Sequence, residues 1–469
     1  MILRGTVLTL DPARPQADGL VVRGGMISAL DGAGGEPLPD GAVILPGFTD
    51  SHVHLLTWSS SLRELPLGGA SLERVLQQVR EAAGGGFVRG FGWAVDDDRA
   101  LTRERLDAVS GDVPVALLAH DFHSLWVNSA ALALADRPLE VPGGVVERDA
   151  DGRPTGILRE EAAWAFRDRY ALPSRAEQLD ALRAALPELS RRGVTAVHDK
   201  DGWLDSIAIV RELRDSDGEL PLRIWHSTPA DRMDEPGADY VKAFMDGTLG
   251  SRTARMLGGG GVEVTPREGF ERIVRDAAAR GLPTAVHAIG DQAARDALDA
   301  FEATRDAWAG LRPRIEHAQC VHPDDAPRFA ALGVTASIQP AMAASDRVLA
   351  ERLWGDRIER SYAYGTLHRA GARLAGGSDA PVEALDPLDG IRAAVLREWR
   401  PQEALDLDTA LHAWTTVPAW LEGREATHGR LALGSAADLV ILDRDPREDL
   451  AGAQVIGTVH EGAWTYRSF

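Results

Sequence analysis

Short apolar runs recur through the middle of this 469-residue chain, and this repetition most limits the fold that the chain can adopt. An early run, ILPGFTDSHVH, is followed much later by seven more between Val194 and Asp379: GVTAVHD, PLRIWHS, VKAFMDG, PTAVHAIGD, PRIEHAQ, VTASIQP and ARLAGGSD. The intervening segments have helical spacing and are rich in Ala, Arg, Asp and Leu. Eight strands alternating with helices are typical of a (β/α)8 barrel. The sequence therefore predicts an α/β fold built on a TIM barrel.

The segments outside the barrel predict two further units. Residues 1–46 and 422–469 both read as short alternating strands joined by Gly and Asp turns. Because the termini of a domain often lie close together, we expect them to form one composite β-sandwich domain. The barrel would then comprise residues 47–60 and 190–421. Residues 61–189 greatly exceed an ordinary connection between a barrel strand and its helix. This length predicts an insert domain after the first strand, and we expect the insert to serve as a substrate-binding lid.

The insert carries its own local signals. The segment GGVVERDADGRPTGIL predicts a β-hairpin that turns at Asp151 and Gly152. Helical spacing flanks it at Ser71 to Ala83 and at Ser174 to Arg192.

Composition restricts the partners of the chain. With 51 basic against 71 acidic residues, the net charge of -20 repels nucleic acid and anionic membranes and favours a small neutral or cationic substrate. Cys320 is the only cysteine, so no intrachain disulfide can form. The start, MILRGTVLTLDPARP, lacks the pattern of a signal peptide, and no apolar run approaches the roughly 20 residues of a membrane span. We expect a cytoplasmic protein, with the oligomeric state, including a homodimer, left open.

Six side chains at or near the ends of the predicted strands are candidate metal ligands: His52, His54, Lys242, His287, His317 and Asp379. Taken singly, each has an ordinary alternative, because a histidine can fill the core or cap a helix, a lysine can form an ion pair, and Asp379 can belong to a turn. His52 and His54 are two residues apart on a predicted strand, so their side chains point the same way. The carboxyl ends of barrel strands meet at one face, and the order of all six therefore favours a single metal site.

Several longer motifs carry a specific resemblance: PGFTDSHVHL, DFHSLWVNSAAL, GGVVERDADGRPTGILREEA, VKAFMDGTLGSRTA, VHAIGDQA, IEHAQ, GSDAPV and GSAADLVILD. With these motifs the chain resembles the amidohydrolase superfamily and, within it, the YtcJ-like branch related to N-substituted formamide deformylases. The resemblance extends essentially from end to end.

The resemblance implies that the six candidates ligate one or two divalent ions, with Lys242 carboxylated to a carbamate that bridges two of them. Imidazole and carboxylate donors suit zinc. A lysine that is kept neutral can add CO2 and become an anionic ligand. Asp379 lies where a carboxylate could take the proton of metal-bound water, which makes it the candidate general base.

The insert offers candidate substrate contacts in His123, Asn128 and Trp93. The resemblance places His123 near the substrate, where an imidazole could polarise the scissile carbonyl or hold an oxyanion. Trp93 could equally belong to the core of the insert. Glu160 and Asp246 are placed outside the metal set, since both could make ordinary hydrogen bonds or ion pairs.

These observations predict a metal-dependent hydrolase in which metal-bound hydroxide attacks an amide or related C–N bond of a small molecule. The alternatives are a deaminase, lactonase or isomerase on the same scaffold, or a non-catalytic metal-stabilised binding protein. An intact Asp379 favours an enzyme. Substrate identity, the number of metal ions and the carboxylation of Lys242 are left open.

Overall fold

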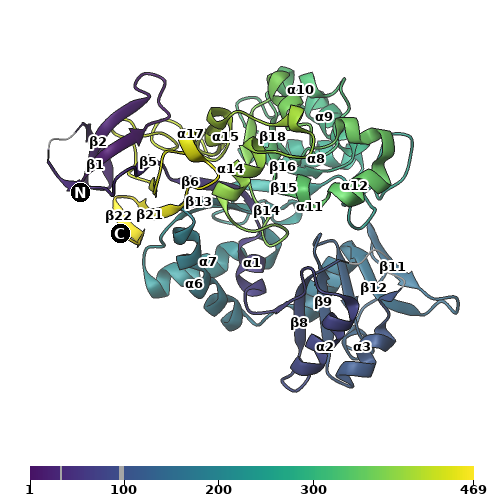
Figure 1. The fold of residues 1–469 in the computed structure, drawn as a ribbon. Helices are drawn as coiled ribbons and strands as arrows, with labels where there is room; N and C mark the ends of the chain where they lie inside the picture. Colours follow the sequence, from purple (N-terminus) through teal and green to yellow (C-terminus); the bar gives the residue numbers. More distant parts are fainter. Residues whose placement is uncertain (32–33, 95–99) are drawn as a thin grey trace.

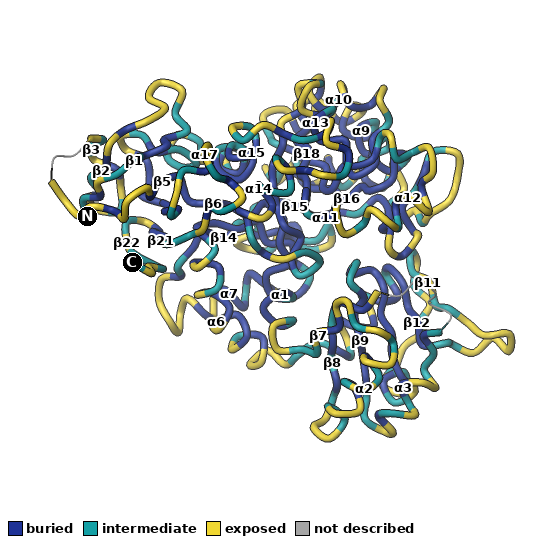
Figure 2. Tube along the Cα trace, in the orientation of Figure 1, coloured by how far each residue is buried: buried dark blue, intermediate teal, exposed yellow. Residues whose placement is uncertain are grey.

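The predicted barrel is present in the computed structural model, which describes residues 1–31, 34–94 and 100–469. Its eight strands follow the chain order from β6 to β19 and pair in parallel throughout. They form a largely buried layer inside the surrounding helices (Figures 1 and 2). The barrel strands are β6 (Phe48–Val53), β13 (Val194–Asp199), β14 (Arg223–Pro229), β15 (Tyr240–Phe244), β16 (Thr284–Ala288), β17 (Arg314–His317), β18 (Thr335–Ile338) and β19 (Leu374–Gly376).

The first and last strands meet at residues that the sequence nominates as metal ligands. The backbone N–H of Asp379 donates to the carbonyl of His52 at 2.7 Å, and that of His54 donates to the carbonyl of Ala380 at 2.9 Å. A parallel bridge between Val53 and Ala380 lies at the same point. Folding of the barrel therefore brings the two ends of the ligand set, far apart in the sequence, side by side.

Helices cover the outside of the barrel, as expected, with one exception. β14 and β15 are joined by a 3₁₀ turn at Ala230–Arg232 and an irregular segment. Only residues 230–239 separate these strands, which is too short for a helical crossover. The barrel-side helices are α1 (Leu55–Ser61), α6 (Arg175–Arg191), α7 (Ser206–Asp217), α8 (Arg267–Ala278), α9 (Asp291–Ala303), α10 (Ala326–Leu332), α11 (Met342–Ser345), α12 (Arg347–Trp354), α13 (Tyr364–Arg369), α14 (Pro387–Val395), α15 (Leu407–Ala413) and α16 (Thr416–Leu421).

Helix α6 begins where the sequence predicts but belongs to the barrel rather than to the insert. Ser174 and Glu177 form a capping box, which satisfies free N–H groups at the start of the helix. Leu182 and Leu189 on its apolar face are fully buried in one cluster with Val53 of β6. The predicted boundary of the insert at residue 189 is therefore too late, because this apolar face packs on the barrel.

The insert folds around a six-stranded sheet in the order β11-β12-β10-β9-β8-β7. The predicted hairpin is formed by β11 and β12, and Ser71 caps helix α2 as its spacing predicted. Figure 1 shows this unit beside the barrel, on the side opposite the chain termini. Its elements are β7 (Leu65–Pro66), β8 (Val88–Trp93), β9 (Val115–Ala119), β10 (Ser124–Val127), β11 (Gly144–Arg148), β12 (Pro154–Glu160), α2 (Leu72–Ala82), α3 (Arg103–Ser110), α4 (Ser129–Leu132) and α5 (Glu161–Phe166).

Strands from both ends of the chain join in one eight-stranded sheet, in which β20 pairs with β5. The joint domain was predicted, but its strands are linked into a single hydrogen-bonded sheet rather than two. Among the described helices, including α17 (Pro446–Asp449), none has the length and apolar character needed to cross a membrane. The strands are β1 (Ile2–Leu8), β2 (Gln16–Arg23), β3 (Met26–Leu30), β4 (Glu36–Pro37), β5 (Val43–Pro46), β20 (Leu439–Leu442), β21 (Val455–His460) and β22 (Ala463–Arg467).

Candidate metal centre

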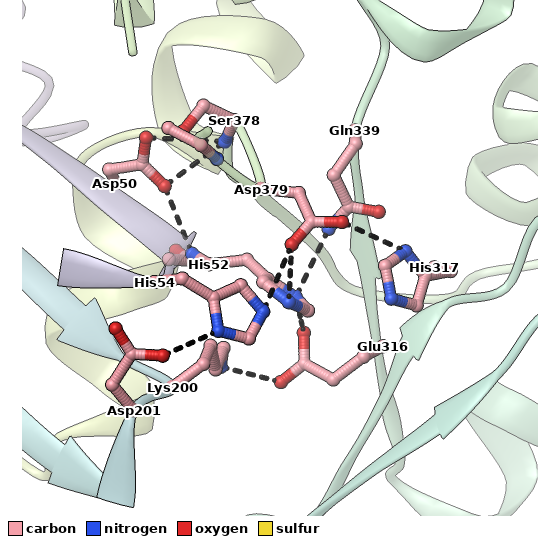
Figure 3. A network of polar contacts seen from close by, with 12 residues as sticks. Asp50, His52, His54, Lys200, Asp201, Glu316, His317, Gln339, Ser378 and Asp379 are labelled. Atoms are coloured by element: carbon pink, nitrogen blue, oxygen red, sulfur yellow. Dashed lines mark hydrogen bonds and ion pairs between the residues drawn. The ribbon is translucent and has the colours of Figure 1, made fainter. Parts of the chain in front are cut away.

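Three histidines surround the Asp379 carboxylate at the carboxyl end of the barrel (Figure 3). The Nε2 atoms of His52 and His54 lie 3.1 and 3.5 Å from Asp379 Oδ1. His317 Nδ1 lies 4.0 Å from Asp379 Oδ2. One ligand atom each from His52, His317 and Asp379 falls within 4.8 Å of the others, a spacing that allows a single ion to be shared.

His287 and Lys242 extend this group from the neighbouring strands β16 and β15. The ring centroid of His287 lies 4.5 Å from that of His317. Lys242 Nζ lies 4.7 Å from the centre of the Phe244 ring. Both residues line the same cavity as the other four. The structure thus places all six predicted ligands around one cavity.

Two buried carboxylates orient the His-x-His pair, and the sequence did not single them out. Glu316 Oε2 accepts a hydrogen bond from His52 Nδ1 at 2.7 Å, and Asp201 Oδ1 accepts one from His54 Nδ1 at 2.8 Å. Each bond fixes the ring and leaves Nε2 directed toward Asp379, as carboxylates commonly do for metal-binding histidines. The available signal was an acid next to a ligand, because Glu316 directly precedes His317 in IEHAQ.

Two further aspartates hold the loops that carry the ligands. Asp50 accepts backbone hydrogen bonds from His52 and Ser378, each at 3.0 Å, and so ties β6 to the segment bearing Asp379. Asp246 accepts one from the backbone of Gly290 at 2.8 Å and links the loops after β15 and β16. Burial raises the pKa of Asp50 to about 6 and that of Asp246 to about 7. Placing Asp246 outside the metal set agrees with this backbone-binding role.

Burial controls the protonation of the candidate ligands. It lowers the pKa values of His52, His287 and His317 and so favours neutral imidazole, the form that binds metals. The same effect lowers the pKa of Lys242 to about 8.

The donors present at this site fit a divalent metal ion. His317 Nδ1 is fully buried and has no hydrogen-bond partner among the described residues. An unpartnered buried ring nitrogen costs free energy unless something ligates it. Neutral imidazoles and a carboxylate at one point are the donors that zinc prefers. The chemistry of the residues thus agrees with a metal centre.

Lysine is rare in this chain and confined to the barrel interior. Lys200 and Lys242 are the only two lysines among 51 Lys and Arg residues, and both are buried. Lys200 Nζ forms an ion pair with Glu316 Oε1 at 2.8 Å. Lys242, in contrast, has no ion pair within the parts of the chain that the structure describes, and it lines the cavity. Among the described residues that line the cavity there is thus an amine, that of Lys242, and no guanidinium.

The insert contributes one predicted site residue, His123, to this cavity. His123 Nδ1 lies 2.6 Å from Glu160 Oε2. Burial alone would lower the pKa of His123, but the Glu160 carboxylate outweighs it and the pKa is raised. Around the histidines the wall is aromatic, formed by Phe122, Trp164, Trp203 and Phe244.

The structure corrects the assignment of Asn128 as a substrate contact, because this side chain does not line the cavity. Trp93 does not line it either, but it lines an adjoining cavity that shares His120 and Asp121 with the first, and its substrate role stays a prediction. The side-chain oxygen of Asn128 accepts from the backbone N–H groups of Val115 and Ala131, and its amide donates to Ser110 Oγ and the Val113 carbonyl. These four bonds use the hydrogen-bonding groups of the amide. Trp93 is buried in the core of the insert, and its indole N–H donates to the Leu117 carbonyl at 2.7 Å.

Asn128→Ala is therefore expected to act on stability rather than on catalysis. Loss of the helix cap and of the buried bonds should lower the free energy of unfolding of the insert by about 1–3 kcal/mol. Chemical denaturation would measure this loss, and KM at a temperature where the variant is folded should be unchanged. A large rise in KM with unchanged stability would restore a substrate role for this side chain.

Comparisons with known proteins agree with this architecture. Residues 40–466 match the model of the amidohydrolase family. The putative amidohydrolase YtcJ of Bacillus subtilis is 32% identical over 450 residues, covering 87% of this chain and 85% of that protein. The N-substituted formamide deformylase of Arthrobacter pascens is 28% identical, covering 99% of this chain and 98% of that protein. An uncharacterized metal-dependent hydrolase from Pyrococcus horikoshii has 29% identity and a TM-score of 0.76, covering 95% of this chain and 97% of its own.

The barrel fold and the ligand-type residues at its mouth place this chain in the class of metal-dependent hydrolases. This chain belongs to the amidohydrolase family. The resemblance indicated by its motifs is thereby confirmed, including its likeness to YtcJ and to the formamide deformylase.

Proposed function

We propose that this protein hydrolyses the C–N bond of a small amide with the help of a divalent metal. The observation that carries the proposal is the convergence of six ligand-type side chains on a cavity that also exposes His123. A binding or scaffold protein would need no carboxylate placed to accept a proton within a ring of histidines.

The candidate ligands would hold the metal, with zinc the ion best suited to their donor atoms. A bound divalent ion would act as a Lewis acid, lowering the pKa of water and polarising a carbonyl group. Glu316 and Asp201 hold His52 and His54 in the tautomers that leave Nε2 free.

The residues of the chain account for the proton transfers. Asp379 accepts a proton from the attacking water as the water oxygen bonds to the amide carbon. His123 donates a hydrogen bond from Nε2 to the substrate oxygen as negative charge develops there. Asp379 then returns the proton to the nitrogen as the C–N bond breaks, giving a carboxylic acid and an amine.

The cavity wall favours an uncharged substrate with an apolar substituent. Trp164 packs 5.1 Å from Phe244, and Phe122 stacks on His54 at 4.8 Å, so aromatic surface lies beside the candidate ligands. Among the described residues that line this cavity there is no arginine to pair with a substrate carboxylate. N-substituted formamides, the substrate class in the name of the Arthrobacter relative, meet these requirements.

A substrate panel tests the proposal. Metal-reconstituted protein would be assayed against N-substituted formamides, N-acyl amino acids, hydantoins and lactones, with product identification by mass spectrometry. We expect amine release from the formamides and weaker activity on the N-acyl amino acids, whose carboxylate lacks a partner. Turnover of lactones alone, or ammonia release from an amino-substituted ring, would instead support the lactonase or deaminase alternative.

We also propose that Lys242 carries a carbamate. Its neutral amine would attack CO2, forming an N–C bond and releasing one proton, so that the neutral amine becomes an anionic ligand. Three features support this: the burial of Lys242, its pKa of about 8 and its place beside His287 and His317.

Carbon-13 NMR of protein equilibrated with ¹³CO2 is expected to show a carbamate signal that disappears in Lys242→Ala. The signal should persist in Lys200→Met, the matched control at the other lysine. Lys242→Ala should lose most of its bound metal, and short carboxylic acids should restore part of the activity by supplying the missing ligand. An unmodified Lys242 in fully active, metal-replete protein would refute the carbamate.

A further inference from the structure

We propose that Glu160 is a positioning residue for this reaction, holding His123 so that its free ring nitrogen points into the cavity. The inference rests on the proposed function, in which His123 donates a hydrogen bond to the substrate oxygen. Glu160 would act through His123 and would not itself touch the substrate.

A chain of buried hydrogen bonds connects Glu160 to the cavity. His123 Nδ1 donates to Glu160 Oε2 at 2.6 Å, and the Thr253 hydroxyl donates to the other oxygen of the same carboxylate. Glu160 is fully buried, and His123 is 6% exposed. An ionised carboxylate with two donors fixes an imidazole more firmly than a neutral acceptor does. An imidazolium that donates its Nδ1–H to this carboxylate keeps a second N–H at Nε2, which it can donate to a substrate oxygen.

The second ring nitrogen of His123 is left available to the cavity. With Nδ1 bound to Glu160, Nε2 has no hydrogen-bond partner among the residues that the structure describes. The His123 ring lies 5.2 Å from that of His287 and packs edge-on against Trp164 at 4.8 Å. His123 therefore reaches the side of the cavity that holds the candidate metal ligands, where its Nε2 can form a hydrogen bond with the substrate oxygen.

The backbone of Glu160, whose side chain makes this contact, has an unfavourable conformation. Its φ of 51° and ψ of -132° lie in a region that residues other than glycine rarely adopt. The backbone N–H of Glu160 also donates to the His123 carbonyl at 2.9 Å, so the two residues are joined through main chain and side chain. Conformations of this kind persist where the surroundings enforce them and occur often at functional sites.

The barrel is shaped to receive the Glu160 side chain. A Cβ atom at Gly247, in the loop after β15, would lie 2.4 Å from Glu160 Oε1 and 2.1 Å from Thr253 Oγ1. Only a glycine leaves room there for the carboxylate and its hydroxyl partner. Because Gly247 and Thr253 belong to the barrel and Glu160 to the insert, this contact fixes the insert-borne His123 relative to the candidate metal ligands.

A double-mutant cycle between Glu160 and His123 tests the inference. On a verified substrate, His123→Ala should lower kcat by about 10² to 10³. Glu160→Ala should lower kcat by about 10- to 100-fold with metal content retained, as for other partners that orient an active-site histidine. In the His123→Ala background, Glu160→Ala should cause almost no further loss, because its partner is absent. Glu160→Gln should recover part of the loss, and Glu161→Gln, the matched change one residue away, should leave kcat unchanged.

Equal losses from Glu160→Ala in both backgrounds would overturn the inference, because Glu160 would then act independently of His123. A readout independent of activity separates this failure from failure of the proposed function. In protein with ¹⁵N-labelled histidine, the protonated Nδ1 signal of His123, assigned by its absence in His123→Ala, should be lost or shifted in Glu160→Ala. If no amide is hydrolysed but this signal changes, the proposed function fails while the positioning contact stands. An unchanged signal would refute the contact itself.

Discussion

Alanine at His52 or His317 is expected to remove bound metal and hydrolytic activity together while leaving the barrel folded. Both rings lie against Asp379, and loss of one ligand should lower metal affinity by more than about 100-fold. The fold should survive His52→Ala because Glu316 keeps its ion pairs with Lys200 and Arg314, both at 2.8 Å. Elemental analysis, kcat/KM and thermal unfolding would be measured on the same preparations.

His322→Ala provides the matched control for these variants. His322 lies in the loop after β17, a few residues beyond His317, but its ring contacts Asp324 rather than the cavity. Its replacement should change neither metal content nor turnover. Full metal content and activity in both His52→Ala and His317→Ala would show that the ligands have been misidentified.

Asp379→Asn is expected to abolish most turnover while retaining part of the metal. The amide has nearly the shape of the carboxylate and can ligate weakly, but it cannot accept the proton of the attacking water. General-base catalysis contributes about 10²- to 10⁴-fold, so kcat should fall within that range. Stopped assays at several pH values, together with metal analysis, would test this expectation.

Glu383→Gln offers a comparison on the wall of the same cavity. Glu383 bonds to the Ser345 hydroxyl and does not join the three histidines around Asp379. The same loss of charge at this position should reduce kcat far less than Asp379→Asn. Near-normal turnover of Asp379→Asn with an unchanged pH profile would exclude Asp379 as the base.

Local patterns in the sequence were sufficient to predict the barrel and the clustering of the candidate ligands. Apolar runs ending in His52, His287 or His317 specify both a buried strand and its carboxyl end, and barrel geometry brings such ends together. Capping residues such as Ser71 and Ser174 marked the helix starts, because they satisfy free N–H groups locally.

Features that depend on partners distant in sequence could not be predicted in this way. The role of Glu316 depends on His52, which lies 264 residues away, and a single sequence does not reveal such a pairing. Asn128 was predicted to contact the substrate, but its side chain makes four hydrogen bonds within the insert, and its own motif does not reveal these partners. Helix α6 resembles an insert helix in its own periodicity, and only its packing assigns it to the barrel.

The central claim, that hydrolysis depends on a metal held at the mouth of the barrel, is tested most directly by titrating metal-free protein with zinc. Bound zinc and the rate of amine release from an N-substituted formamide would be measured in the same samples. We predict negligible hydrolysis without metal and a rate that rises in proportion to bound zinc until the site is filled at one or two ions per chain. Full amide hydrolysis by protein shown to contain no metal would contradict the claim.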